Sequence, residues 1–281
     1  MIELPYTELI KIAKLDTFLL RAEIDEPVIT SFGIISERTV LLIRVEDSDG
    51  AFGWGEVFGN FPTHGAENRQ HLIRDYITPL AFSETWSSPL HAFETITAKT
   101  HVLSLQSGEP GPFAQSIAGL DIALWDLAAR KANMPLWKLM GGDFGSVPTY
   151  GSGLNPAGFE EIVENKITEG YNAFKIKIGF ERQADLTTLS NIRKIIGDKI
   201  LMVDVNQGWD IYTAKDNWLV YSEFNLNWIE EPIPADRPLT EWRHLASQEG
   251  STQIRIGTFL YLSLIHISEP TRRTPISYAV F

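Results

Sequence analysis

The stretches that decide the fold of this chain are AFKIKIG at residues 173–179, LMVDVNQG at 201–208 and WIEEP at 228–232. Each is an apolar, strand-like run that carries charged or amide side chains toward its end, just before a loop. Strand side chains alternate between two faces, so Lys175 and Lys177 are predicted to share one face, as are Asp204 and Asn206. Amines beside carboxylates at successive strand ends predict a site for metal-assisted proton abstraction, and therefore an enzyme.

The sequence around these stretches alternates between strand and helix patterns. Beyond Val147 the strand candidates are 148–152, 173–179, 200–206, 228–232 and 254–258, and helices are predicted to begin near Gly158, Ala184, Thr213 and Leu239. This alternation predicts right-handed parallel crossovers, in either a βα barrel or an open doubly wound sheet. Barrel active sites lie at the carboxyl ends of the strands, where the polar residues fall, so a barrel is favoured.

The first half of the chain has a different pattern. Strand-like runs at 8–24, 38–46 and 51–57, with the turn signal DSDG at 47–50, predict an antiparallel meander. Helical spacing follows over 68–100 and is clearest over 114–132. The glycines at 53, 55 and 59 open no helix, so we interpret them as hairpin glycines and not as a dinucleotide-binding loop.

Composition narrows the class of protein. At 281 residues and 44% apolar content the chain can form a large core. A formal net charge of -12 argues against a nucleic-acid partner, because phosphate binding needs clustered cationic side chains. The chain has no cysteine, and its first residues resemble neither a signal peptide nor a membrane span. We therefore expect a cytoplasmic protein without a membrane partner.

The lysines and carboxylates suit removal of a proton alpha to a carboxylate. That proton is weakly acidic, so the enolate needs concentrated positive charge, which a divalent cation on Asp204 and Glu230 would supply. Such hard oxygen ligands favour Mg²⁺, and Asn206 would complete the metal shell or bind a substrate oxygen. A lysine acts as a base only if its pKa falls toward neutrality, and a second ammonium two residues away acts in that direction.

Each feature also has a plainer interpretation. Lysines in a strand are commonly solubilising, Asp in the LMVDVNQG stretch is compatible with turn chemistry, and Glu before Pro is common in loops. The combination favours function, because all three features fall at successive strand ends and AFKIKI is too apolar for an exposed edge strand.

Together these stretches resemble the mandelate racemase and muconate lactonizing enzyme group of the enolase superfamily. The resemblance runs from about residue 10 to 258 and also includes SIAGLDIALWDLAARK at 116–131 and PLWKLMGG at 135–142. It implies an α+β capping domain at 1–145 and a barrel domain of the (β/α)7β type at 146–261, incomplete here with about five strands. It implies a small carboxylate substrate, a homo-oligomer and a Mg²⁺ cofactor.

The resemblance also implies roles for individual residues. Lys177 would be the catalytic base and Lys175 would assist it electrostatically, while Asp204 and Glu230 would be the first two metal ligands. A capping loop with Thr30, Phe32 and Phe58 would close over the substrate and set substrate specificity.

The chain departs from the family pattern near its end. The family has an acid as third metal ligand after the fifth strand, where this chain has Gly257 and Thr258. Strands six to eight, which carry the second acid/base group, are not recognisable. The stretch 262–281 has no helical period and resembles the translation of a sequencing-library adapter. We therefore predict a non-native tail there and a chain that is C-terminally truncated.

Three hypotheses follow. The first is an enolase-type lyase or isomerase, either an acid-sugar dehydratase or a racemase/epimerase. The second is a catalytically inactive fragment of such an enzyme. The third, more distant, is a metal-independent barrel enzyme that forms a Schiff base on Lys175 or Lys177.

Overall fold

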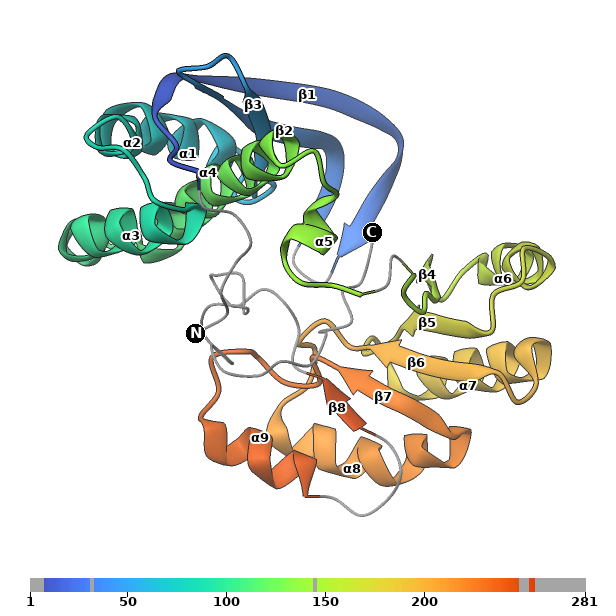
Figure 1. Cartoon of the computed structure of the whole chain (residues 1–281). Coiled ribbons are helices and arrows are strands. Elements are labelled where there is room, and N and C mark those ends of the chain that lie inside the picture. Colours follow the sequence, from blue (N-terminus) through green and yellow to red (C-terminus); the bar gives the residue numbers. More distant parts are fainter. Residues whose placement is uncertain (1–7, 31–32, 144–145, 248–252, 256–281) are drawn as a thin grey trace. The chain divides into compact units, whose positions relative to one another are not determined.

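The computed structural model describes residues 8–30, 33–143, 146–247 and 253–255 (Figure 1). The chain divides into two compact units between Gly145 and Ser146, and each is described by itself. The predicted tail at 262–281, the residue Phe32 and the position of Thr258 lie outside the described residues.

The N-terminal unit combines an antiparallel sheet with helices. Its strands pair in the order β1-β2-β3. Its elements are β1 (Ile12–Thr30), β2 (Gly33–Asp47), β3 (Phe52–Val57), α1 (Gly65–Leu72), the π-helical turn η1 (Ile73–Ile77), α2 (Thr78–Ala81), α3 (Pro89–Gln106), α4 (Pro110–Lys131) and α5 (Leu136–Leu139). The predicted meander and the long helix over 114–132 are both present.

The core of this unit lies between the sheet and helix α4. Leu41, Ile43 and Val45 alternate along β2 and are fully buried against apolar residues of α4 such as Leu124. This is the period-two burial expected of a sheet with one covered face.

Two glycines of β3 allow α4 to approach the sheet. A Cβ added to Gly53 would lie 2.1 Å from the Ala123 carbonyl oxygen, and one added to Gly55 would lie 2.0 Å from the Gly119 carbonyl oxygen. No side chain fits at those distances. These two glycines lie in β3, the second strand of the β2–β3 hairpin, as predicted, and close helix–sheet packing is what requires them.

The C-terminal unit is a parallel sheet of five described strands in the order β4-β5-β6-β7-β8. Its elements are β4 (Gly151–Leu154), α6 (Phe159–Thr168), β5 (Ala173–Lys177), α7 (Arg182–Ile196), β6 (Ile200–Asp204), α8 (Ile211–Tyr221), the 3₁₀ turn η2 (Ser222–Phe224), β7 (Leu226–Glu230), α9 (Leu239–Ala246) and β8 (Gln253–Arg255). Strand alternates with helix throughout, as predicted.

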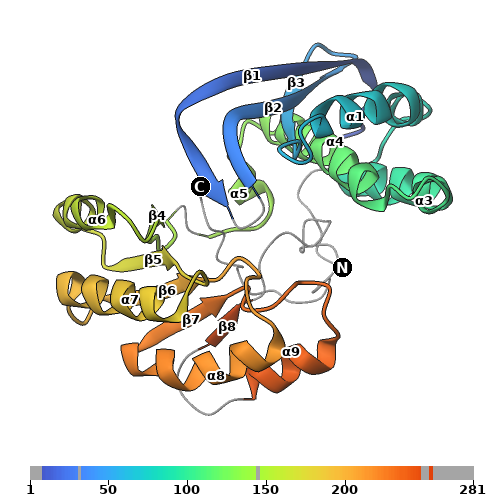
Figure 2. The ribbon, with the colours of Figure 1, turned by 180° about the vertical axis from the view of Figure 1, so that it is seen from behind.

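The helices of this unit pack on one face of its sheet, as Figure 1 and the reverse view in Figure 2 show. Phe174 and Ile176 of β5 are fully buried in that apolar layer, with Leu189 of α7 and Trp218 of α8. Because side chains alternate along a strand, Lys175 and Lys177 of β5 face away from the helices. That opposite face bears the candidate site.

An antiparallel α+β unit followed by parallel βα units confirms the predicted fold class. The parallel unit is a partial barrel of about the predicted five strands. The boundaries of β4 to β7 agree with the predictions to within about three residues, and the predicted end of the fifth strand at 258 lies outside the described residues.

Candidate active site

Strand register places the predicted base and metal ligands in one row across the sheet. Lys177 of β5 pairs with Asp204 of β6, Asp204 with Glu230 of β7, and Glu230 with Arg255 of β8. Residues in one row of a parallel sheet project to the same face, and neighbouring strands lie about 4.8 Å apart. The row ends β5, β6 and β7, so it forms their carboxyl edge.

Lys175 lies beneath this row and joins its carboxylates. The Lys175 Nζ lies 2.9 Å from Glu230 Oε2 and 3.3 Å from Asp204 Oδ2. The lysine side chain is only 10% exposed. Burial by itself would lower the pKa of Lys175, but the charges of Asp204 and Glu230 outweigh burial and raise its pKa above the ordinary value. The lysine is therefore held as an ammonium.

Lys177 differs from Lys175. It is half-buried on the same face, and within the described residues no hydrogen bond or ion pair engages its amine. The two lysines of β5 thus divide into a fixed cation and an uncommitted amine.

A left-handed turn after β6 orients Asp204. Asn206 has φ 49°, which brings both its backbone N–H and its side-chain amide onto Asp204 Oδ1, at 2.9 and 2.8 Å. Asn tolerates this conformation better than most residues. With Lys175 on the other oxygen, both oxygens of the Asp204 carboxylate are engaged. Asn206 lies beyond the end of β6, so this turn brings it beside Asp204, and not the strand alternation from which a shared face was predicted.

Glu231 is a buried residue at this edge that the sequence analysis did not single out. It is 3% exposed, has φ 45° ahead of Pro232, and its Oε1 has no hydrogen-bond partner within the described chain. Burial, followed by repulsion from Asp204, raises the pKa of the Glu231 carboxyl group. A strained backbone with an unpaired buried oxygen marks a functional region more often than a structural one.

Aromatic side chains flank the fixed cation. Lys175 Nζ lies 5.7 Å from the ring centroid of Tyr150, and Tyr150 packs edge-on against Trp228 at 5.7 Å. Burial raises the pKa of the Tyr150 hydroxyl, although Lys175 opposes the shift. Sequence reasoning missed Tyr150, because its significance lies in contacts with residues of two strands, Lys175 and Trp228.

The candidate specificity loop belongs to the N-terminal unit. Phe58 is half-buried and lies 6.1 Å from Phe61, centroid to centroid. Thr30 ends β1, and nothing further is described of its side chain. These residues were predicted to act with the barrel, and that remains a prediction.

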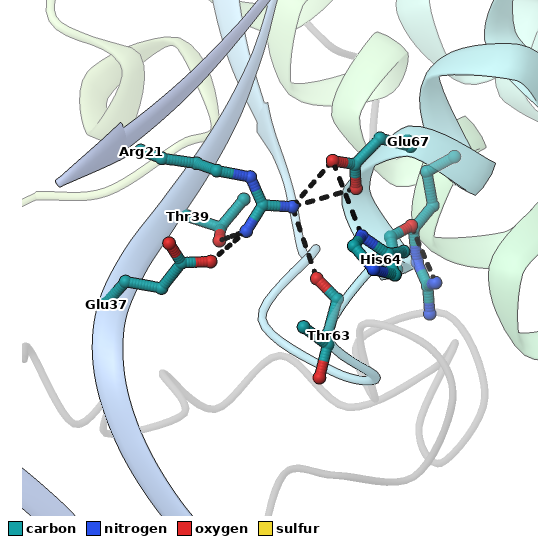
Figure 3. Close-up of polar contacts among 8 residues, drawn as sticks. Arg21, Glu37, Thr39, Thr63, His64 and Glu67 are labelled. Carbon is teal, nitrogen blue, oxygen red and sulfur yellow. Dashed lines mark hydrogen bonds and ion pairs between the residues drawn. The ribbon is translucent and has the colours of Figure 1, made fainter. Parts of the chain in front are cut away.

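Arg21 holds Thr63 and the first turn of α1 through hydrogen bonds, as Figure 3 shows. Its guanidinium donates to the Thr63 carbonyl at 3.2 Å and to both Glu67 oxygens at 2.7 and 2.9 Å. It also contacts Glu37 and Thr39 of β2. Hydrogen bonding to Arg21 lowers the pKa of the Glu67 carboxyl group. Two strands and the start of α1 therefore meet at one guanidinium.

The donor set at the carboxyl edge of the parallel sheet fits magnesium. Asp204 and Glu230 present hard carboxylate oxygens that converge on one cation, the Lys175 ammonium. Mg²⁺ uses one or two protein carboxylates and keeps several waters. The described residues contain no group of three or more acidic or histidine side chains suited to a metal, so two protein ligands are what this part of the chain offers.

The two described cavities lie elsewhere. One, of about 430 Å³, follows the end of α4 and includes Asp126 and Met134. The other, also about 430 Å³, includes Trp209, Tyr212 and Arg237. Neither contains Lys177, Asp204 or Glu230, and we assign the site by its chemistry.

Comparison with known families identifies the group. Residues 14–141 match the mandelate racemase / muconate lactonizing enzyme N-terminal domain, and residues 159–261 match the enolase C-terminal domain-like family. The chain belongs to the mandelate racemase/muconate lactonizing enzyme group of the enolase superfamily. The family consists of isomerases and lyases.

Individual relatives agree with this membership. An o-succinylbenzoate synthase from Geobacillus stearothermophilus is 30% identical, over 77% of this chain and 56% of that protein. A crystal structure of a mandelate racemase/muconate lactonizing enzyme from Bordetella bronchiseptica RB50 is 42% identical with a TM-score of 0.81, over 89% of this chain and 66% of the other. A racemase from Streptomyces coelicolor A3(2) with bound magnesium is 28% identical with a TM-score of 0.77, over 88% and 69%.

Further relatives are cycloisomerases, a racemase and a dehydratase, several of them named for acid-sugar substrates. The chain spans a little over half the length of the first of these curated relatives. Within the described residues, no helix is both long and apolar enough to cross a membrane.

Proposed function

We propose that the protein abstracts a proton alpha to a carboxylate, with Lys177 as the base. The observation that carries this is the row Lys177–Asp204–Glu230 at the carboxyl edge of adjacent parallel strands, with the Lys175 ammonium joining the two carboxylates. Family membership supports the same chemistry.

Lys177, Lys175 and Asn206 each have a distinct task in this mechanism. Lys177 takes the alpha proton, because its amine is on the same face as the carboxylates and no described partner holds it. Lys175 stays protonated and supplies a fixed positive charge near the negative charge that forms on the substrate. Asn206 keeps Asp204 in place through its two hydrogen bonds.

Asp204 and Glu230 would hold magnesium. When bound, the ion would act as a Lewis acid toward the substrate carboxylate. A relative with bound magnesium supports this assignment.

For the substrate class we propose a small acid sugar, processed by dehydration or by racemisation/epimerisation. The support is the set of relatives named for a dehydratase, a racemase and acid-sugar cycloisomerases. The outcome of the reaction depends on a second acid/base group, which is not among the described site residues.

The test is alpha-proton exchange. The purified protein is incubated in deuterated buffer with Mg²⁺ and a panel of acid sugars, and deuterium incorporation is followed by NMR. We expect exchange that chelator abolishes and that Lys177→Met lowers by about 10²–10⁴-fold. Lys194→Met, at an exposed helix lysine, is the matched control and should leave exchange unchanged.

A second candidate is that the 281-residue chain does not catalyse by itself. The observation in its favour is that no three acidic or histidine side chains suited to a metal converge within the described residues. Exchange absent from this chain, but present in a version of the length of its relatives, would support it. Alpha-proton exchange that survives chelation, together with a covalent lysine–substrate adduct trapped by borohydride, would contradict both candidates and indicate a Schiff base.

A further inference from the structure

Two loops at the carboxyl edge of the sheet are joined by a ladder of hydrogen bonds. The loop after β6 (residues 205–210) donates to the loop after β7 (residues 231–238) from alternate backbone N–H groups. Gln207 N–H donates to the Glu231 carbonyl at 2.8 Å, and Trp209 N–H donates to the Pro232 carbonyl at 3.1 Å. The first loop follows Asp204 and the second follows Glu230, so the ladder joins the chain segments that carry the two candidate ligands.

Gln207 is the side chain that completes this ladder. Its Oε1 accepts from the Ala235 backbone N–H at 2.9 Å, and its Nε2 donates to Glu231 Oε2 at 3.4 Å. The amide therefore spans the second loop from its first residue to its fifth. With its own backbone N–H, Gln207 contributes three hydrogen bonds between the two loops.

The backbone at Gln207 is unusual in a way that serves this bridge. Gln207 has φ 65° and directly follows Asn206 at φ 49°, so two successive residues other than glycine are left-handed. Such residues cost free energy and persist where the surrounding structure fixes them. Here the turn sends Asn206 onto Asp204 and Gln207 onto the Glu231 loop.

The loop after β7 contains the carboxylate with an unpaired oxygen, that of Glu231. Glu231 is buried, its Oε1 has no partner within the described chain, and Gln207 Nε2 is the side-chain donor that reaches its other oxygen. Without that donor the buried Glu231 carboxylate would lose a hydrogen bond. An unsatisfied buried carboxylate costs free energy, so we expect the loop to move until water reaches it.

We propose that Gln207 is a positioning residue that holds the loop after Glu230 against the loop after Asp204, and so fixes the two carboxylates for a shared divalent cation. This inference rests on the proposed function for the identity of the two ligands. Outer hydrogen bonds of this kind commonly change metal affinity by about 10- to 100-fold when removed.

The variant that tests it is Gln207→Met, which keeps side-chain length and removes both side-chain hydrogen bonds. The matched control is Asn172→Ala. Asn172 is an exposed amide just before β5, at the opposite end of the same sheet, where it bonds to Lys199 and Gly170. Magnesium affinity of the whole chain is measured by calorimetry, and backbone hydrogen exchange of residues 204–210 and 230–236 is measured without metal.

We expect Gln207→Met to weaken magnesium binding at least about tenfold. We also expect faster exchange at Ala235 and in both loops, with the rest of the sheet still protected. Asn172→Ala should change neither measurement. Asp204→Asn and Glu230→Gln should abolish binding while leaving the ladder protected, which separates ligand loss from loop release.

The outcomes distinguish this inference from the proposed function. If the wild-type chain binds magnesium and Gln207→Met binds it equally well, the inference is overturned and the proposed function stands. If the wild-type chain binds no magnesium, the metal assignment fails. Backbone hydrogen exchange of the two loops then decides by itself whether Gln207 holds them together. If backbone hydrogen exchange in both loops is the same in Gln207→Met as in the wild-type chain, the inference is overturned in either case.

Discussion

Each unit of the chain buries a lysine among carboxylates, and the two clusters can be compared directly. In the N-terminal unit, Lys131 Nζ lies 2.6 Å from Asp47 and 2.8 Å from Asp49. In the C-terminal unit, Lys175 Nζ lies 2.9 Å from Glu230 and 3.3 Å from Asp204. Both lysine side chains are 10% exposed. By contacts and burial alone they look alike.

Their surroundings separate them. The buried Asp47 is fully engaged, because one oxygen takes Lys131 and the other accepts the backbone N–H groups of Lys11 and Ser48. That cluster joins the end of α4 to a hairpin and leaves its buried carboxylate satisfied.

The Lys175 cluster has a further buried carboxylate nearby, that of Glu231, which is not fully hydrogen-bonded within the described residues. Glu231 is buried beside it with an unpaired oxygen, and left-handed residues surround it at 206, 207 and 231. A buried ion pair whose carboxylate has complete hydrogen bonding indicates a structural connection. A buried carboxylate oxygen without a described partner, in a strained backbone, indicates a place for another cation.

The largest effect is expected for Lys131→Met. Removing the cation leaves the buried Asp47 carboxylate without its ion partner, which should lower the free energy of unfolding by about 3 kcal/mol. Chemical denaturation measures it. Magnesium should not restore the loss, and restoration would contradict the structural interpretation of this cluster.

A smaller loss is expected for Lys175→Met, about 2 kcal/mol, because Glu230 is more exposed than Asp47 and can regain water. Here magnesium should compensate, since a ligand at 100 times its Kd stabilises a protein by about 2.7 kcal/mol. Thermal unfolding with and without the ion measures this. Equal responses of the Lys131 and Lys175 variants to magnesium would remove the distinction between the clusters.

The smallest effect concerns pH. Burial raises the pKa of the Asp185 carboxyl group, so its contribution to stability is present below the unfolded pKa of 3.8 and is lost as pH rises through the folded value. The hydrogen bond from Lys131 lowers the pKa of Asp49, so its contribution is lost as pH falls. The contribution of Asp185 to stability therefore falls as pH rises, whereas the contribution of Asp49 falls as pH decreases.

Asp185→Asn tests that sign. Between about pH 4 and about pH 7 the variant should lose less stability than the wild type, by about 1.4 kcal/mol for each unit that the pKa is raised. Asp198→Asn, at an exposed position, is the control and should follow the wild type. A variant that loses more stability than the wild type over this range would show that the shift has the opposite direction.

Much of the fold was predictable because its signals are local. Period-two alternation in AFKIKIG, the helical spacing over 114–132 and the alternation of strands with helices are properties of short segments. Gly53 and Gly55 show the limit. Their sequence context resembles a hairpin, and only the packing of α4 shows that two carbonyl oxygens occupy the space of their side chains.

The candidate site divides in the same way. Lys175, Lys177, Asp204, Asn206 and Glu230 could be named from strand-end chemistry. Gln207, Tyr150 and Glu231 could not, because their significance lies in contacts with residues 24 or more positions away or in backbone conformation. Such contacts depend on strand register, which no single segment specifies.

The sequence by itself determined which residue types end each strand, and with them the family and the class of chemistry. The tertiary structure decided which of two neighbouring lysines is committed. Both lysines of β5 face the same way, but Lys175 meets the carboxylates of two other strands while the Lys177 amine has no described partner. The physical reason is that charge interactions depend on separation in space, and the separation between Lys175 and Glu230 is set by three paired strands.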